Sequence, residues 1–286
     1  MNFREALNSG KFIITAELSS PRGVEVEPII EAASILRDKI DGVNVTDNQR
    51  AKMHLSSLAF CALLHQNGFD PILQMTCRDR NALALQSDVL GAYALGLRNI
   101  LALTGDYPVG GPVRPVYDLD SVQLISIIKK MEREGVDLYD EKLSGRPRFL
   151  VGGAVNPGAE PLEMQIVKLR KKIEAGADFF QSQVIYDVKS FMKFLKELNE
   201  PKIKILAGIL PIKSYNMAVF LNEKVPGVSI PEKILKRVKE AKDPEEEGIK
   251  ISVEIIHELK PICAGIHLMT LNNVQVIPEI LGRLKI

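Results

Sequence analysis

Short apolar runs alternate with amphipathic, helix-like segments along the whole of this sequence, and the alternation occurs eight times. The strand-like runs are 12–18, 42–46, 71–76, 99–103, 149–155, 179–184, 204–210 and 265–269. The helix-like segments that follow them are 27–39, 54–66, 81–95, 121–134, 162–175, 188–198, 215–222 with further helix to 260, and 274–284. Eight consecutive βα units without a linker favour a closed (β/α)8 barrel over an open doubly wound sheet. We therefore predict a TIM barrel that forms a single domain over residues 1–286.

Size, charge and cysteine content exclude several other classes of protein. The chain has 286 residues, close to the ~250 that are typical of such a barrel. Its net charge of +1 gives no electrostatic basis for binding nucleic acid or an anionic membrane, and no apolar run is long enough to span a bilayer. Cys61, Cys77 and Cys263 are isolated in the sequence and are predicted to be free thiols. We expect a cytoplasmic protein that has neither a nucleic acid nor a membrane as its partner.

Residues at the carboxyl ends of barrel strands share one face, which is where such barrels bind their ligands. The predicted set on this face is Glu17, Thr46, Asp47, Gln74, Thr76, Asp106, Asn156, Gln181, Gln183, Leu210, Pro211, His267 and Thr270. His267 is the one imidazole in the set, so we predict no metal site. The sequence also lacks the glycine-rich phosphate loops of dinucleotide and triphosphate sites. An amide-rich pocket with carboxylates suits a planar heteroaromatic ligand such as a pterin or a flavin, because amides both donate and accept hydrogen bonds.

Two acids in this set are candidates for the chemistry. Asp106 follows the apolar run 99–103 by way of a glycine, although an acid in a surface turn would give the same pattern. Glu17 is flanked by apolar residues on the strand 12–18. Removal of water favours the protonated form of a carboxyl group, which is the form that a general acid needs. The alternative for Glu17 is a structural salt bridge, and the sequence by itself weighs the two equally.

Five segments of the chain resemble the methylenetetrahydrofolate reductase family. They are AELSSPR at 16–22, LRNILALTGD at 97–106, AGADFFQSQ at 175–183, GILPI at 208–212 and GIHLMTLN at 265–272. The segments occur in the order found in the family, and all of them lie on predicted strands and their carboxyl ends. The resemblance implies the catalytic barrel of the family, and we expect the regulatory domain of the larger relatives to be absent.

The resemblance implies a flavin-dependent reduction of 5,10-methylenetetrahydrofolate to 5-methyltetrahydrofolate. Glu17 matches the general acid of the family, which protonates N10 so that the five-membered ring opens to an iminium cation at N5. Asp106 matches the acid that lies between the pterin and the flavin, where its charge lowers the reduction potential of the flavin. Gln183 matches the amide that hydrogen-bonds the pterin.

The flavin contacts of the family transfer to this sequence less completely. Thr46 matches a threonine at the flavin ring, Ala154 a backbone contact, and Lys172 a basic residue near the phosphates of the cofactor. Well-studied bacterial relatives have Arg, His, Tyr and His at the positions of Thr104, Gln74, Asn156 and Glu160. We retain Gln74 and Asn156 as cofactor-binding positions, and we expect FAD, with FMN as the alternative.

Two other functions fit the same set of residues. One is a pterin-binding barrel that transfers a methyl group without a flavin. The other is a reductase subunit that takes its electrons from an iron-sulfur or zinc-containing partner protein instead of from NAD(P)H. The sequence has no cluster motif of its own, so any cluster would belong to that partner. In each case we expect a folate substrate and a homo-oligomeric assembly.

Overall fold

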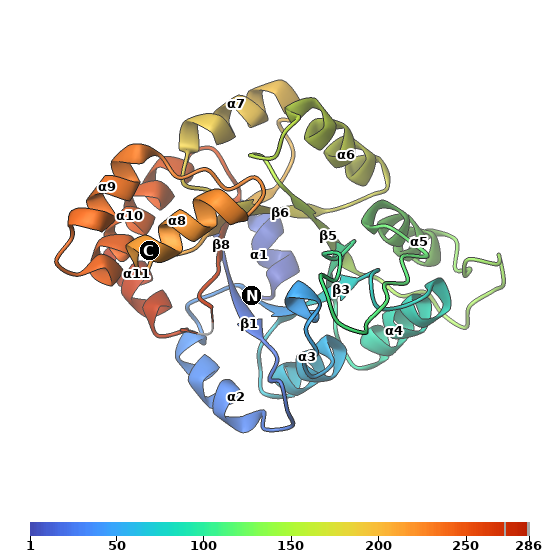
Figure 1. The fold of residues 1–286 in the computed structure, drawn as a ribbon. Helices are drawn as coiled ribbons and strands as arrows, with labels where there is room; N and C mark the ends of the chain where they lie inside the picture. The colour runs from blue at the N-terminus through green and yellow to red at the C-terminus, as the bar shows by residue number, and fades with distance from the viewer. Residues whose placement is uncertain (272, 285–286) are drawn as a thin grey trace.

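The computed structural model describes residues 1–271 and 273–284 and contains a closed barrel of eight parallel strands, arranged in sequence order (Figure 1). The strands are β1 (Ile13–Ser19), β2 (Gly42–Thr46), β3 (Pro71–Thr76), β4 (Asn99–Leu103), β5 (Leu150–Val155), β6 (Phe179–Val184), β7 (Ile205–Ile209) and β8 (Gly265–Leu268). Every predicted strand is present, with bounds that differ from the prediction by at most one residue at either end. The predicted (β/α)8 barrel is therefore confirmed. Asn272, which belongs to the last of the family-like segments, lies outside the described residues.

Helices surround the barrel on its outside, except α1, which lies across one end of it (Figure 1). They are α1 (Phe3–Ser9), α2 (Glu27–Ala33), α3 (Ser57–Gln66), α4 (Ala82–Ala94), α5 (Ser121–Arg133), α6 (Leu162–Glu174), α7 (Val188–Leu198), α8 (Tyr215–Lys224), α9 (Glu232–Glu240), α10 (Pro244–Leu259) and α11 (Val276–Leu284), with short 3₁₀ turns at η1 (Ser34–Leu36) and η2 (Gln49–Ala51). Each strand except the last pairs with the next strand along the chain, and β8 closes the barrel against β1.

Two helix predictions are wrong in extent. The helix predicted at 27–39 ends at the close of α2 and continues only as η1, and Asp38 adopts a φ of 61°, which is outside the helical region. The helix predicted at 215–222, with further helix to 260, is three separate helices, α8, α9 and α10. Pro231 is the N-cap of α9 and Pro244 lies in the first turn of α10. A proline is tolerated at a helix start but has no N–H with which to continue a preceding helix, so each one begins a new segment.

Helix α1, which the sequence analysis did not predict, closes the amino-terminal end of the barrel. The side chain of Asn2 accepts a hydrogen bond from the backbone N–H of Glu5, and the Glu5 carboxylate accepts one from the backbone N–H of Asn2, so that the two form a capping box. The fully buried Phe3 ring packs edge-on against Phe179 of β6, with 5.2 Å between the ring centroids. The Phe3 amide also donates to Asp70 Oδ2 at 2.6 Å. Helix α1 therefore covers the amino-terminal end of the barrel, and the carboxyl end remains open.

The interior of the barrel changes from apolar to polar along the strands. Its lower layer consists of Ile13, Ile72, Leu101, Leu150, Phe179 and Leu206, which pack with α1 in one cluster. Because side chains alternate between the two faces of a strand, the residues two positions further on also point inward, and among them are Thr15, Gln74, Gln181 and, on β8, His267. Gly152 of β5 has no side chain to place there, and a Cβ atom would lie 2.4 Å from the Phe179 ring. The polar layer thus forms directly above an apolar floor.

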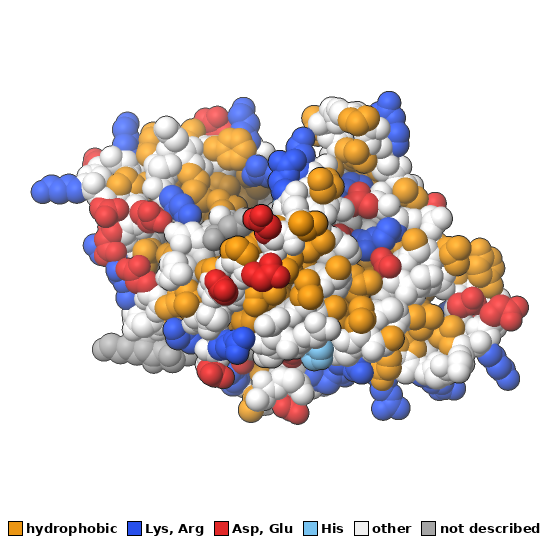
Figure 2. All heavy atoms as spheres, turned by 90° about the horizontal axis from the view of Figure 1, so that it is seen from below, with side chains coloured by type: hydrophobic (Ala, Val, Ile, Leu, Met, Phe, Trp, Pro, Cys, Tyr) orange, Lys and Arg blue, Asp and Glu red, His pale blue; other side chains and the backbone are white. Residues whose placement is uncertain are grey.

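The distribution of surface charge and the state of the cysteines match what the sequence predicts. On the side shown in Figure 2, Lys and Arg are interspersed with acidic and apolar side chains and do not gather into one basic patch. Cys61, Cys77 and Cys263 are free thiols, as predicted. Within residues 1–271 and 273–284, no helix has the length and apolar character needed to cross a bilayer.

Candidate functional site

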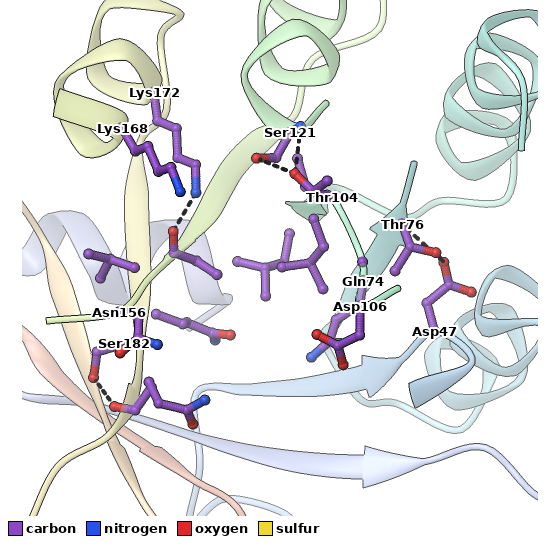
Figure 3. Close-up of a pocket in the computed structure, with 18 of the residues that line it drawn as sticks. Asp47, Gln74, Thr76, Thr104, Asp106, Ser121, Asn156, Lys168, Lys172 and Ser182 are labelled. Atoms are coloured by element: carbon purple, nitrogen blue, oxygen red, sulfur yellow. Dashed lines mark hydrogen bonds between the residues drawn. The ribbon is translucent and has the colours of Figure 1, made fainter. Parts of the chain in front are cut away.

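A cavity of about 670 Å³ opens at the carboxyl ends of the strands. This volume lies within the range of small-molecule sites. The predicted site residues on its wall are Glu17, Gln74, Asp106, Ala154, Asn156, Lys172 and Gln183 (Figure 3). Thr46 is not on the wall, because its hydroxyl donates to Gln49 Oε1 at 2.8 Å, and Gln49 lines the cavity in its place. The fold therefore brings both candidate acids, three amide side chains and a lysine to one site.

Glu17 reaches the cavity from β1, and its side chain is 23% exposed. Its Oε2 atom lies 3.7 Å from Nε2 of His267, which is on β8 and almost fully buried. No hydrogen bond to the Glu17 carboxyl group is formed by any of the described residues. The carboxyl group is thus open to a ligand on one side and faces a single imidazole on the other.

Asp106 is exposed at the cavity mouth, immediately after β4. The backbone turns at Gly105, whose φ of 90° favours glycine, and a Cβ atom there would lie 2.9 Å from Cβ of Arg78. The buried Arg78 guanidinium donates to the Asp106 carbonyl at 3.4 Å and pairs with Asp79 at 2.6 Å. The Tyr117 hydroxyl donates to the Gly105 carbonyl at 3.0 Å. These contacts hold the backbone of the loop and leave the Asp106 carboxylate free for a ligand.

Asp47, which the sequence places beside Asp106 in the strand-end set, has a different environment. Its Oδ2 atom accepts from both the amide and the hydroxyl of Thr76 at 2.8 Å and is also paired with Arg80. Its Oδ1 atom accepts from the Ser57 hydroxyl at 3.2 Å. Both oxygens are therefore occupied within the protein, and Asp47 ties the ends of β2 and β3 together.

Two lysines of α6 form the basic part of the wall. Lys168 and Lys172 are one helical turn apart and extend side by side toward the barrel (Figure 3). Lys172 Nζ donates to the Ala154 carbonyl at 2.5 Å. Burial lowers the pKa of the Lys172 ammonium to about 8, Asp120 partly opposes the shift, and the charge of Lys168 adds to it. No carboxylate pairs with either lysine among the described residues, so the wall carries positive charge without an internal counter-ion.

The amides of β3 and β6 offer hydrogen bonds to a ligand. Gln183 Oε1 accepts from the Val184 amide at 3.0 Å, which leaves the amide nitrogen of Gln183 free. Gln181 is 4% exposed, and its buried Nε2 has no partner among the described residues. Gln74 makes no side-chain hydrogen bond within the same part of the chain and lines the cavity. These groups supply donors where a heterocycle with carbonyl and imine acceptors would lie.

Asn156 lines the cavity but uses its amide group elsewhere. Its Nδ2 donates to the Pro226 carbonyl at 3.0 Å, across to the segment that follows α8. Gly227 passes so close that a Cβ atom there would overlap the Asn156 amide. The Oδ1 atom of Asn156 is buried and has no partner among the described residues. Asn156 therefore joins two loops, and its side-chain oxygen is buried at this junction.

Comparison with known sequences shows the family of this chain. A profile described as methylenetetrahydrofolate reductase matches residues 2–285. The chain belongs to this family. The chain is 28% identical over 267 residues to a probable methylenetetrahydrofolate reductase (NADPH) of Caenorhabditis elegans. The matched region covers 91% of this chain and 39% of that protein.

Other relatives of the family are closer in length. A 5,10-methylenetetrahydrofolate reductase of Pectobacterium carotovorum is 27% identical over 241 residues, which is 79% of this chain and 76% of that protein. An uncharacterized protein from Clostridium thermocellum, described as binding two copies of 5-methyl-5,6,7,8-tetrahydrofolic acid, has the same fold. It superimposes with a TM-score of 0.64 over 98% of this chain and 96% of its own, at 17% identity. This chain spans well under half of the longest of these relatives.

The structure adds residues to which the sequence analysis gave no role. Lys168 was not singled out, although its spacing of four residues from Lys172 on a predicted helix places the two on one face. Gln181 was in the strand-end set without a function. Thr15 and Asn44 are outside that set and contact His267. Only the register of β8, β1 and β2 shows that these three side chains meet.

Proposed function

We propose that this protein reduces 5,10-methylenetetrahydrofolate to 5-methyltetrahydrofolate with a bound flavin. The observation that carries the proposal is that Glu17, Asp106 and Gln183 line one cavity in a member of the methylenetetrahydrofolate reductase family. The activity of the relatives is part of their names and supports the same reaction for this chain.

In this proposal Glu17 is the proton donor. Opening the five-membered ring breaks the bond between N10 and the bridging carbon, and N10 leaves as an amine only if it gains a proton. The O–H bond of Glu17 breaks, its proton goes to N10, and the bridging carbon remains on N5 as an iminium cation. Glu17 suits this role because it is partly enclosed and meets no hydrogen-bond donor that would hold it as a structural carboxylate among the described residues.

Asp106 and Gln183 are proposed to bind the pterin ring. The carboxylate of Asp106 accepts from ring N–H groups, and the free amide nitrogen of Gln183 donates to a ring acceptor. The negative charge of Asp106 also stabilises the cation that forms at N5, which lowers the barrier to ring opening.

The wall of the cavity fits a flavin. A buried cation without a counter-ion is unfavourable, so Lys172 with Lys168 beside it would be stabilised by a phosphate group. Ala154 and Gln74 lie where the ring system would extend from that phosphate toward the acids. The flavin, when bound, supplies the hydride that reduces the iminium carbon. We propose FAD, with FMN as the alternative, and NAD(P)H or a partner protein as the source of electrons.

The test separates binding from proton transfer. Cofactor extracted from the purified protein identifies FAD or FMN, and a chain that binds neither would contradict the flavin. Glu17→Gln keeps the shape of the side chain and removes the transferable proton. Chemically reduced Glu17→Gln protein should bind flavin and folate normally, while its oxidation by methylenetetrahydrofolate falls by roughly 10²–10⁴-fold.

The matched control is Glu25→Gln, an exposed glutamate in the loop after β1, which should oxidise at the wild-type rate. Reducing the enzyme chemically makes the assay independent of the natural electron donor. A Glu17→Gln protein that reacts at the wild-type rate would assign Glu17 a purely structural role.

A further inference from the structure

His267 is a buried imidazole that meets Glu17 and two neutral polar side chains inside the barrel. The strand register brings them together, since Thr15 pairs with His267 across β1 and β8, and Glu17 pairs with Asn44 across β1 and β2. His267, Thr15 and Asn44 are each at most 2% exposed. Glu17 and His267 both line the cavity, but the Glu17 side chain is 23% exposed and the His267 side chain only 2%.

Each ring nitrogen of His267 has a separate environment. Nδ1 lies 3.1 Å from the Thr15 hydroxyl oxygen and 3.4 Å from the Asn44 amide nitrogen. Nε2 points the other way, to Oε2 of Glu17 at 3.7 Å. Within residues 1–271 and 273–284, Glu17 is the one acid in ion-pair range of this imidazole. The back of the ring is thus fixed by neutral groups, and its front meets the candidate proton donor.

The neighbours of Nδ1 allow the ring to match both protonation states of Glu17. The Thr15 hydroxyl donates to the Ile266 carbonyl at 3.3 Å, so its oxygen can accept a hydrogen bond from a protonated Nδ1. Nε2 is then an acceptor for the O–H group of protonated Glu17. The Asn44 amide instead donates to a bare Nδ1, and Nε2–H then donates to the Glu17 carboxylate. In both arrangements one proton lies between Nε2 and Oε2.

We propose that His267 is a positioning residue that orients the Glu17 carboxyl group toward the folate through its Nε2 atom. The role rests on the proposed function of Glu17. His267 is almost fully buried and acts through Glu17, and the contact of 3.7 Å shortens to a hydrogen bond when the ligand fills the cavity, as catalytic contacts do when an enzyme binds its substrate. In the arrangement with Asn44 donating to Nδ1, Nε2–H donates to Oε2 of Glu17, and Oε1 carries the proton that goes to N10.

The test is a double-mutant cycle between His267 and Glu17. His267→Leu should slow the oxidation of chemically reduced protein by methylenetetrahydrofolate by roughly 10²-fold, because misplacing a reacting group by about 1 Å has an effect of this size. The folate KM and the flavin content should stay within about twofold of wild type. His267→Gln, which keeps a polar group near the position of Nε2, should recover part of the rate. In the Glu17→Gln background, His267→Leu should have little further effect, since groups that act as a unit are not additive.

Control variants distinguish a loss of folding, a failure of the positioning role of His267 and a failure of the proposed function of Glu17. His257→Leu changes an exposed histidine of α10 and should leave the rate unchanged. A thermal melt and the flavin content report folding, and if His267→Leu does not fold, His267→Gln and His267→Asn carry the cycle. Equal losses from His267→Leu in both backgrounds, or a loss confined to KM, would overturn the positioning role. If Glu17→Gln itself keeps full activity, the proposed function fails instead.

Discussion

Lys172→Met should stabilise the protein without its cofactor and at the same time weaken binding of the flavin phosphate. The ammonium group of Lys172 is enclosed between α6 and β5 and has no carboxylate partner among the described residues. Burial of this charge is unfavourable unless an anion binds. Met has a similar shape and no charge, so the folded chain no longer has to enclose a cation.

The size of the effect follows from the pKa of Lys172. Its ordinary value is 10.5 and the folded protein lowers it to about 8, a difference of about 2.5 units, which corresponds to about 3 kcal/mol at 1.36 kcal/mol per unit. The variant also loses the hydrogen bond to the Ala154 carbonyl, which contributes about 1 kcal/mol. The free energy of unfolding at pH 7 should therefore rise by about 2 kcal/mol.

The gain depends on pH in a defined direction. Folded Lys172 loses its proton near pH 8, whereas the unfolded chain keeps the proton up to about pH 10.5. The unfolded state binds more protons over this interval, so wild-type stability rises with pH between these values. The advantage of Lys172→Met is complete below about pH 8. It disappears toward pH 10.5, where the wild type keeps its hydrogen bond and carries no charge.

Urea unfolding of the flavin-free proteins at pH 7 and pH 10 measures this difference. Lys171→Met is the matched control, because Lys171 is exposed and adjacent on α6, and it should change stability by less than about 0.5 kcal/mol at both pH values. Binding of FMN should weaken in Lys172→Met, while riboflavin, which lacks the phosphate, should bind as it does to wild type. A destabilised Lys172→Met protein at pH 7, an equal gain at both pH values, or unchanged FMN affinity would refute the reasoning.

Three further predictions concern the fold and Asp106. Gly152→Ala should destabilise the protein by about 1–3 kcal/mol in urea unfolding, because its Cβ would lie 2.4 Å from the Phe179 ring, whereas Gly282→Ala, with no atom within 4 Å, should be neutral or slightly stabilising. Phe3→Ala leaves a cavity at the floor of the barrel and should lower the free energy of unfolding by about 3–5 kcal/mol. A loss no larger than that caused by substituting an exposed residue would show that α1 does not close the barrel. Asp106→Asn should raise the reduction potential of the bound flavin, which a reductive titration against a reference dye measures, and an unchanged potential would place the carboxylate away from the ring.

The strands could be predicted because each is a short apolar run between breakers, and parallel strands in a barrel need little other information. The boundaries of α2 and of the long segment after β7 could not, because the pattern of apolar residues continues through Asp38, Pro231 and Pro244. Helix α1 had a readable signal in the capping box of Asn2 and Glu5. Its place under the barrel depends on Phe3 meeting Phe179, and a contact between residues so far apart in sequence is not visible in a local pattern.

The order of the strands predicts that the candidate site residues lie at one end of the barrel. It does not predict which of their polar groups are already hydrogen-bonded within the protein. Asp47 and Asp106 look alike in the sequence, yet Thr76 and Arg80 occupy the first carboxylate, while the second is free.

The paired and unpaired polar groups lie on different sides of the cavity. Polar side chains at the ends of β2 and β3 are paired with one another, as in the Asp47 network and in Thr46 with Gln49. Lys172, which has no carboxylate partner among the described residues, lies on the side of β5 and α6, and the Glu17 carboxyl group lies at β1. In the proposed reaction the flavin phosphate would lie at α6 and the reacting amine of the folate at β1. Cofactor and substrate would then meet above Gln181 and His267, the polar layer on the barrel floor.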